Sequence, residues 1–344
     1  MFEKVLITDE ERQMFPKWTV LDEDLADVDP VLAEQVLESR LEFSRGDISR
    51  TDYWHDPEGI DVIADIQYVD DGTRAHRLDL YLPHDSVVRG SKTTPVYIGI
   101  HGGGFVYGYK DLNRNFCTNL AKQGFAVFSI SYRPAPETDF LGQLEDTAAA
   151  FRWIREHRDD YPVAQDQVFL TGDSAGGTLA LYMTAVERSS EFAEKIGIGQ
   201  SGLSVAGSAL ISPLTDLTSY LALCGFDAKC EFGDARLVPI IDCIAPMFFT
   251  RLFDRGAELA DLKTMAEEVD FPSVFINTSS DDFIHVESLK LATALVAAGR
   301  DVELHDWHTD KGQTLGHVFP VCMSWLDESQ KVLRLMRDFA YAKL

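Results

Sequence analysis

The sequence predicts an α/β protein with a mostly parallel central sheet, helices on both faces of the sheet and a helical cap. Two observations support this fold class. Short apolar runs of strand length alternate along the chain with segments of helical length, which is the pattern of parallel strands joined by crossover helices. These runs are almost continuously apolar, which is typical of strands buried on both faces. They cover residues 95–100, 125–130, 168–170, 205–211, 271–276 and 302–305.

Helices are expected between and after these strands, and a hairpin before them. The hairpin strands are residues 62–69 and 77–82, because Leu78, Leu80 and Leu82 repeat with a period of two and an Asp-Gly pair at 71–72 separates the strands. An earlier helix is expected at 30–43, where Pro30 suits the first turn. The helices that alternate with the strands are expected at 113–123, 141–157, 177–186, 286–298 and 323–343.

Two segments lie outside this alternation. Residues 1–60 mix apolar and acidic side chains without strand alternation, and the stretch from 213 to 270 has helical pieces, such as 239–253, but no convincing strand. A long excursion of this kind, inserted between two strands, is suited to cover a binding site. We therefore predict an N-terminal cap segment at 1–60, a catalytic domain at 61–344 and a cap insertion at about 214–270.

Composition excludes several classes of protein. The chain of 344 residues is 45% apolar and 25% charged, as in folded globular proteins, and it has no apolar run long enough to insert into a membrane. Its net charge of −25 would repel nucleic acids and anionic membranes. Residues 1–15 lack the basic start and apolar core of a secretory signal, so a cytoplasmic location is expected. Five scattered cysteines fit neither a disulfide framework nor a zinc motif, and we expect reduced thiols.

The strongest chemical signal is GDSAGG at residues 172–177, between a strand-like run and a helix-like run. Glycines on both sides of Ser174 allow the sharp turn that such a connection requires. The serine hydroxyl would then stand at the positive end of the helix, where it can attack a carbonyl. A glycine-rich loop that only packs a strand against a helix is the alternative. The strand before the motif and the helix after it favour a nucleophile at Ser174.

A second signal, HGGGFVYG at residues 101–108, directly follows the strand at 95–100. Consecutive glycines let backbone N–H groups point at a ligand, so we expect Gly103 and Gly104, together with Ala175, to form an oxyanion hole. A phosphate cradle would instead require a helix starting at the glycines and a nearby lysine. His101 is expected to brace this loop without transferring protons.

Four motifs together resemble the hormone-sensitive-lipase-like family of α/β-hydrolases. They are HGGGFVYG, SYRPAPE at 131–137, GDSAGG and SPLTDLT at 212–218, and the resemblance extends from about residue 75 to the C-terminus. It implies an α/β-hydrolase fold, a cap made of the N-terminal segment plus an insertion, and a carboxylester hydrolase whose catalytic triad follows the chain order Ser, Asp, His.

The acid and the histidine of this triad are sought after Ser174. The segment following the strand at 271–276 offers Asp281 and Asp282, and the resemblance favours Asp282 because it lies five residues before Glu287. Asp281 remains the alternative. The later histidines are His285, His305, His308 and His317. His317 lies in a glycine-containing loop before the last helix and matches the family's catalytic histidine, whereas His308 is expected to be a surface residue.

These residues predict a serine hydrolase that acts on a small-molecule ester, and the family resemblance implies a short acyl chain. Ser174 would attack the carbonyl, His317 would take its proton, Asp282 would orient the imidazole, and no metal or cofactor would be needed. An amidase or deacetylase acting on arylamides or formamides with the same triad is the alternative function. A non-catalytic ligand receptor is disfavoured, because such relatives lose the triad histidine and His317 is present. The sequence leaves a homodimer open.

Overall fold

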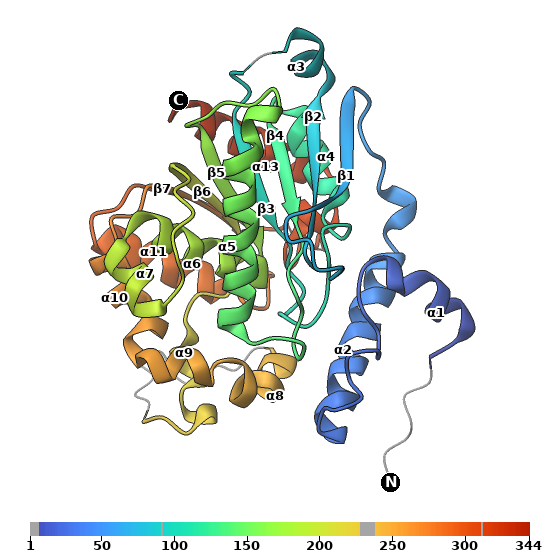
Figure 1. Ribbon diagram of the computed structural model, residues 1–344, viewed down its shortest axis with the longest axis vertical. Helices are drawn as coiled ribbons and strands as arrows, with labels where there is room; N and C mark the ends of the chain where they lie inside the picture. Colours follow the sequence, from blue (N-terminus) through green and yellow to red (C-terminus); the bar gives the residue numbers. More distant parts are fainter. Residues whose placement is uncertain (1–6, 91, 228–237, 311) are drawn as a thin grey trace.

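The computed structural model describes residues 7–90, 92–227, 238–310 and 312–344, and these residues form one eight-stranded sheet (Figure 1). The strand order across the sheet is β1-β2-β4-β3-β5-β6-β7-β8. The bounds are β1 (Ile60–Gln67), β2 (Arg77–Pro83), β3 (Val96–Ile100), β4 (Ala126–Ile130), β5 (Val168–Asp173), β6 (Val205–Ile211), β7 (Ser273–Ser279) and β8 (Val302–Trp307).

The pairing confirms the predicted fold class and hairpin. β1 and β2 pair antiparallel, as do β2 and β4, while the remaining neighbours pair parallel. One expectation is wrong: β8 is not buried on both faces, since all of its residues are partly or fully exposed. The reason is position, because β8 is an edge strand of the sheet and only β7 pairs with it among the described strands.

Side chains alternate between the two faces of the sheet, as the period of a strand requires. Ile98 and Phe128 join the apolar core on one face, while Tyr97 and Val127 join the core on the other. The first core lies under α5 (Phe140–His157), α6 (Ala175–Arg188), α7 (Ser190–Ile196), α10 (Leu262–Glu268) and α11 (His285–Ala297). The second lies under α4 (Arg114–Lys122), α12 (Phe319–Cys322) and α13 (Asp327–Tyr341).

The N-terminal segment and the excursion after β6 meet at one end of the molecule. α2 (Pro30–Ile48) contacts α8 (Pro239–Phe248), and both lie at the lower end of the view in Figure 1. Asp29 caps α2 by accepting hydrogen bonds from the N–H groups of Val31 and Leu32, and Pro30 occupies the first turn, as expected. The remaining helices are α1 (Asp9–Met14), α3 (His84–Arg89) and α9 (Thr250–Arg255).

The helix expected at 239–253 is divided in two, because α8 ends at Phe248 and α9 starts at Thr250. Pro246 lies inside α8 and has no N–H to donate to the carbonyl four residues earlier, which weakens the hydrogen-bond ladder of this helix. The final helix is also shorter than expected, since α13 starts at Asp327, after Leu326 in an extended conformation, and ends at Tyr341.

No helix in the described part of the chain is long and apolar enough to cross a bilayer. The cysteines that the structure describes, Cys117, Cys224, Cys243 and Cys322, are free thiols, as expected. Cys230 lies outside the described residues.

Candidate active site

Ser174 occupies a strained turn between β5 and α6. Its backbone has φ 51° and ψ −122°, a conformation that costs an L-residue about 1–3 kcal/mol. The flanking glycines are required by space, because a Cβ on Gly172 would lie 2.3 Å from the carbonyl oxygen of Gly176. A Cβ on Gly176 would lie 2.2 Å from the carbonyl oxygen of Ile100. The turn is held in place by the Ser174 N–H, which donates to the carbonyl of Ile211 in β6 at 2.9 Å.

The glycine loop after β3 lies beside this turn. Gly103 and Gly104 have φ of 112° and 57°, values that place them in the left-handed region favoured by glycine. The carbonyl of Gly103 accepts hydrogen bonds from the N–H groups of Val106 and Tyr107, which close the loop into a turn. Among the described residues, the N–H groups of Gly103 and Gly104 donate to no protein acceptor. Ala175 is the first residue of α6, where backbone N–H groups also lack helical partners.

Asp173, which sequence analysis did not single out, links the two loops. It is buried, and its Oδ1 accepts hydrogen bonds from the N–H of Gly102 at 3.1 Å and from Nδ2 of Asn113 at 2.6 Å. Burial raises the pKa of this carboxyl to about 6, although the bond from Asn113 and the charge of His317 act in the opposite direction. The carboxyl therefore fixes the glycine loop against the residue that precedes the nucleophile.

His317 and Asp282 form a hydrogen-bonded pair, with Nδ1 of His317 2.9 Å from Oδ1 of Asp282. The same oxygen accepts the N–H of Ile284 at 2.9 Å. Burial would raise the pKa of Asp282, but the hydrogen bond and charge of His317, with a further contribution from Ser212, lower it below its usual value. The paired carboxyl is thus ionised at neutral pH and suited to orient an imidazole.

Asp281 does not contact His317 and holds the loop before it instead. Its two carboxylate oxygens accept hydrogen bonds from the N–H groups of Leu315 and Gly316, both at 3.0 Å. The hydroxyl of Ser279 donates to the carbonyl of Gly316 at 3.0 Å, which adds a second anchor. The two adjacent acids therefore have different contacts, and only Asp282 is paired with the histidine.

No other histidine side chain contacts this pair among the described residues. His308 is 76% exposed in its side chain and lies 3.6 Å from Asp306, so it is a surface residue, as expected. His285 also contacts Asp306, through Nε2 at 2.9 Å. His101 is buried and stacks on Tyr132 with ring centroids 4.2 Å apart, and burial lowers its pKa to about 4. A buried neutral imidazole in this position braces the glycine loop.

The predicted nucleophile, histidine and oxyanion donors all line one cavity of about 410 Å³. Asp282 does not line this cavity, but it is hydrogen-bonded to His317, which does. Most of the wall is apolar, which suits the acyl or alcohol part of an uncharged organic ligand. The lining side chains outside the predicted triad and oxyanion hole include Phe43, Trp54, Tyr107, Leu112, Leu214, Val238, Ile241, Phe283, Ile284, Val318, Val321 and Cys322.

One wall of the cavity comes from the C-terminal half of α2. Asp47 and Arg50 line the cavity and form an ion pair at 2.9 Å, and the hydroxyl of Tyr107 donates to Asp47 at 2.9 Å. Asp47 is buried, and this burial raises the pKa of its carboxyl even though Tyr107 and Arg50 act to lower it. The polar contacts thus attach α2 to Tyr107, which belongs to the glycine loop.

Arg40 is a second connection between α2 and the glycine loop. Its side chain is fully buried, and its guanidinium forms an ion pair with Asp24 at 2.6 Å. Nε donates to the carbonyl of Val106, and Nη2 donates to the carbonyl of Ala135, both at 2.9 Å. One arginine therefore joins the N-terminal segment, the glycine loop and the SYRPAPE motif.

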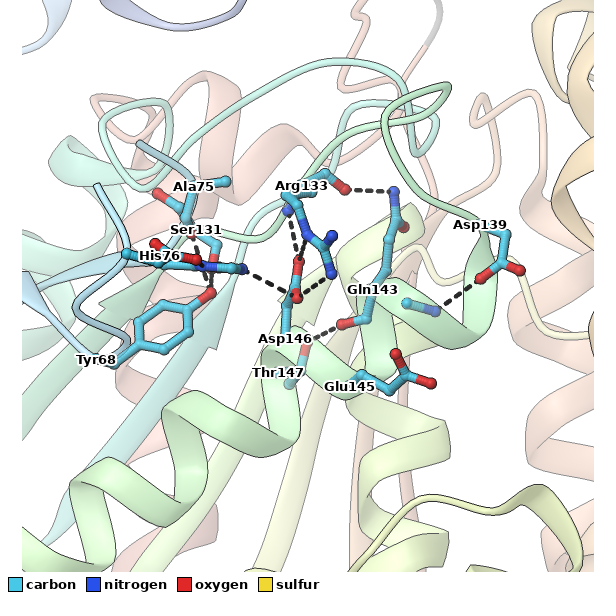
Figure 2. Close-up of polar contacts among 12 residues, drawn as sticks. Tyr68, Ala75, His76, Ser131, Arg133, Asp139, Gln143, Glu145, Asp146 and Thr147 are labelled. Carbon is cyan, nitrogen blue, oxygen red and sulfur yellow. Dashed lines mark hydrogen bonds and ion pairs between the residues drawn. The ribbon is translucent and has the colours of Figure 1, made fainter. Parts of the chain in front are cut away.

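Arg133 of the SYRPAPE motif belongs to a polar network with Asp146, His76 and Gln143 (Figure 2). Arg133 donates to Asp146 through Nε at 2.9 Å and Nη2 at 2.7 Å, and His76 contacts the same carboxylate at 3.1 Å. The amide of Gln143 then donates to the carbonyls of both Phe105 and Arg133, at 2.9 and 3.0 Å. This network fixes the backbone of Phe105, which has φ 66°, next to the predicted oxyanion donors.

Within residues 7–90, 92–227, 238–310 and 312–344, no three His, Cys, Asp or Glu side chains are grouped so that they could hold a metal ion.

A family model described as an alpha/beta hydrolase fold matches residues 97–319, the part of the chain that contains the glycine loop, Ser174, Asp282 and His317. The chain belongs to the α/β-hydrolase fold family. The match confirms the family resemblance that the four motifs indicate.

Curated relatives include esterases and a lipase. Esterase LipI of Mycobacterium tuberculosis is 30% identical over 230 residues, which cover 65% of this chain and 65% of that protein. Lipase 2 of Moraxella sp. is 44% identical over 81 residues, covering 23% of this chain and 19% of that protein. The chain thus spans less than two thirds of the length of the curated relatives it matches. Among solved structures, Esterase B from Lactobacillus rhamnosis has a TM-score of 0.77 at 26% identity, over 91% of this chain and 95% of that chain.

Proposed function

We propose that the protein is a carboxylester hydrolase that cleaves short-chain acyl esters through an acyl-enzyme on Ser174. The observation that carries the proposal is the arrangement around one cavity. A serine on a strained turn, a histidine paired with a buried carboxylate, and unpaired backbone donors all lie there. Nucleophilic acyl transfer requires these three groups in contact with one carbonyl.

In the proposed mechanism, Ser174 Oγ attacks the ester carbonyl while His317 accepts the hydroxyl proton. The Nδ1 contact with Asp282 leaves Nε2 as the nitrogen that accepts this proton, and the ionised carboxylate stabilises the imidazolium that forms. The N–H groups of Gly103, Gly104 and Ala175 stabilise the negative charge on the carbonyl oxygen. His317 then protonates the leaving alcohol, and water attacks the acyl-enzyme by the same steps.

The cap is proposed to set the acyl specificity. Phe43, Gly46 and Trp54 of the N-terminal segment, together with Val238 and Ile241 of the insertion, line the cavity. This supports the predicted division into a cap at 1–60, an insertion at about 214–270 and a catalytic core. A cavity of about 410 Å³ limits the length of chain that it can enclose.

The relatives support both the reaction and the size of the substrate. LipI and Esterase B are esterases by name. A further structure of Esterase B, described as inhibited by a C4-C4 tributyrin phosphonate, has a TM-score of 0.78 at 25% identity. We therefore propose a short-chain ester as the substrate of this chain. Its acyl group would become bonded to Ser174 during the reaction.

The test is a panel of p-nitrophenyl esters of increasing acyl length with the matching anilides. Each methylene that the cavity accommodates should contribute about 0.8 kcal/mol, so kcat/KM should rise and then fall sharply by about eight carbons. The anilides address the amidase alternative, because the same triad serves both and only protonation of the leaving group differs. Faster cleavage of anilides than of esters would replace the proposal with amide hydrolysis.

A further inference from the structure

A second cavity, of about 280 Å³, lies outside the candidate active site. It is formed where the N-terminal segment, the β1–β2 hairpin, the loop after β3 and the end of β4 meet. Its lining contains more basic than acidic side chains, although the whole chain carries a net charge of −25. The lining residues are Lys17, Asp65, Arg74, Arg77, Lys110, Asp111 and Ser131.

Lys110 is the one basic residue of this cavity that acidic partners already balance. Its Nζ lies 2.8 Å from Asp79, 3.0 Å from Asp65 and 3.5 Å from Asp111, and its side chain is 5% exposed. Asp65 is placed for this contact by a β-bulge, where it adopts φ 58° and donates its N–H to Asp79 at 2.8 Å. The acidic side chains of the cavity are therefore committed to the lysine at its base.

The other three basic residues have no ion pair in the described part of the structure. The guanidinium of Arg74 lies 4.1 Å from the ring centre of Tyr109, and one of its nitrogens donates to the backbone carbonyl of Lys17. The guanidinium of Arg77 donates no hydrogen bond to a described residue, and its Nε is buried. A buried guanidinium N–H without an acceptor is costly, so the cavity favours a ligand that brings one.

The segment that carries both arginines is held firmly. Figure 2 shows Ala75 and His76, which separate Arg74 from Arg77, beside Ser131. The hydroxyl of Tyr68 donates to the carbonyls of Ala75 and Ser131, and His76 contacts Asp146 at 3.1 Å. These contacts fix the backbone from which both arginines extend, which reduces the part of the entropic cost of binding that comes from the backbone.

We propose that this cavity binds a phosphate group, free or as the monoester of a small metabolite. Guanidinium groups form paired hydrogen bonds with phosphate oxygens, and the donors of Arg74, Arg77 and Lys17 lack acidic partners. An oxyanion would supply the acceptors that the side chains of Arg74, Arg77 and Lys17 lack. The cavity exceeds the size of inorganic phosphate, so a small organic group can accompany it.

The position of the cavity also gives the bound anion a structural effect. Lys17 belongs to the N-terminal segment, whereas Lys110 and Asp111 directly precede Leu112 and Asn113, which line the candidate active site. An anion held by both sides would join the N-terminal segment to the loop that follows β3. Binding should therefore raise the melting temperature of the protein.

The test is isothermal titration calorimetry of the full chain with inorganic phosphate and with glycerol 1-phosphate, in HEPES at pH 7.5. Sodium chloride keeps the ionic strength constant, so that general screening of the acidic protein contributes no signal. Saturable binding of at least one ligand is expected. Stronger binding of glycerol 1-phosphate assigns the site to a phosphate monoester, and equal or weaker binding assigns it to free phosphate. Succinate, a dicarboxylate of equal charge, should bind more weakly than both.

Matched variants locate the site. Arg77→Gln and Arg74→Gln should each weaken binding by about tenfold or more, as expected for loss of a charge-assisted hydrogen bond. Lys17 is exposed, so Lys17→Gln should leave the fold intact and weaken phosphate binding by a smaller factor. The control is Arg89→Gln. Arg89 lies on α3 with its side chain 76% exposed, and this variant should leave the affinity unchanged.

Absence of saturable binding to wild type, or equal affinity of wild type and the folded Arg77→Gln and Lys17→Gln variants, would overturn the proposal. Neither outcome depends on ester hydrolysis.

Discussion

Asp281 and Asp282 are adjacent in the sequence, yet their carboxylates hold different parts of the candidate active site. Asp282 accepts a 2.9 Å contact from the ring of His317, whereas Asp281 accepts the backbone N–H groups of Leu315 and Gly316. One acid orients the imidazole and the other shapes the loop that carries it. The sequence offers both acids as partners of the histidine, and the contacts in the structure distinguish them.

Asp282→Asn and Asp281→Asn should therefore differ in effect. We expect Asp282→Asn to lower kcat by roughly 10³–10⁴-fold with little change in fold, because the imidazole loses its orientation and its counter-charge. Asp281→Asn should lower kcat by only about tenfold, because one loop hydrogen bond is lost while the histidine keeps its partner. Steady-state kinetics with p-nitrophenyl butyrate measure both. A larger loss for Asp281→Asn would reverse the assignment.

Arg40 should be a major contributor to stability. Arg40→Met leaves Asp24 without its buried partner and removes the donors to Val106 and Ala135, so we expect a loss of about 3–5 kcal/mol in the free energy of unfolding. Arg45→Met on the same helix is the control, since its ion pair with Glu11 is exposed on the arginine side and should contribute under about 1 kcal/mol. Urea titrations compare the two variants, and equal losses would contradict this account.

Gly46 offers a test of the cavity wall. It lies in α2, lines the cavity, and a Cβ built on it would meet no atom within 4 Å. Gly46→Leu should fill this space and shorten the longest acyl or alcohol chain accepted by about two to four carbons, while esters of acetate are still cleaved. Gly199→Leu, at a position with equally open surroundings outside the cavity, is the control. An unchanged chain-length profile in Gly46→Leu would show that this wall does not touch the substrate.

Asp173 predicts a specific pH dependence of stability. Its pKa in the folded protein, about 6, is above its ordinary value of 3.8, so the folded state prefers the neutral carboxyl. This stabilisation is complete below pH ~4 and is lost as the pH rises through about 6. Asp173→Asn keeps an oxygen for Gly102 and Asn113 but cannot ionise. Relative to wild type, the variant should gain up to about 3 kcal/mol between pH 4 and pH 7.

Denaturant titrations of both proteins across this pH range measure the effect. The difference between the two free energies of unfolding is the relevant quantity, because the many other carboxylates titrate in both proteins and cancel. A constant difference from pH 4 to pH 7 would show that Asp173 is not the group responsible.

The parts of the fold that depend on local pattern could be predicted from the sequence. The strand at 205–211 and the start of α2 at Pro30 match the structure, because apolar runs and a proline in the first turn are local signals. The exposure of β8 and the end of α8 at Phe248 could not be predicted. The exposure of β8 depends on which strand is at the edge of the sheet, and Phe248 and Phe249 carry no local signal for the end of a helix.

The same distinction applies to the site. Ser174 and the glycine loop are recognisable in the sequence because their backbone conformations require glycines at neighbouring positions. Asp173 lies inside the recognised motif, but its role depends on Asn113, which is 60 residues away. Arg40 acts on Val106 and Ala135 across 66 and 95 residues. Single polar residues with such distant partners carry no local pattern, so the sequence alone does not distinguish them from surface residues.

Covalent trapping is the most direct test of the proposed acyl-enzyme. The protein is treated with a p-nitrophenyl alkylphosphonate bearing a four-carbon chain, and its intact mass and peptide map are measured. We expect one phosphonyl adduct per chain on Ser174, with release of one equivalent of p-nitrophenol and loss of esterase activity in parallel. Ser174→Ala should form no adduct. An adduct on another residue, or full ester turnover by Ser174→Ala, would contradict the assignment of Ser174 as the nucleophile.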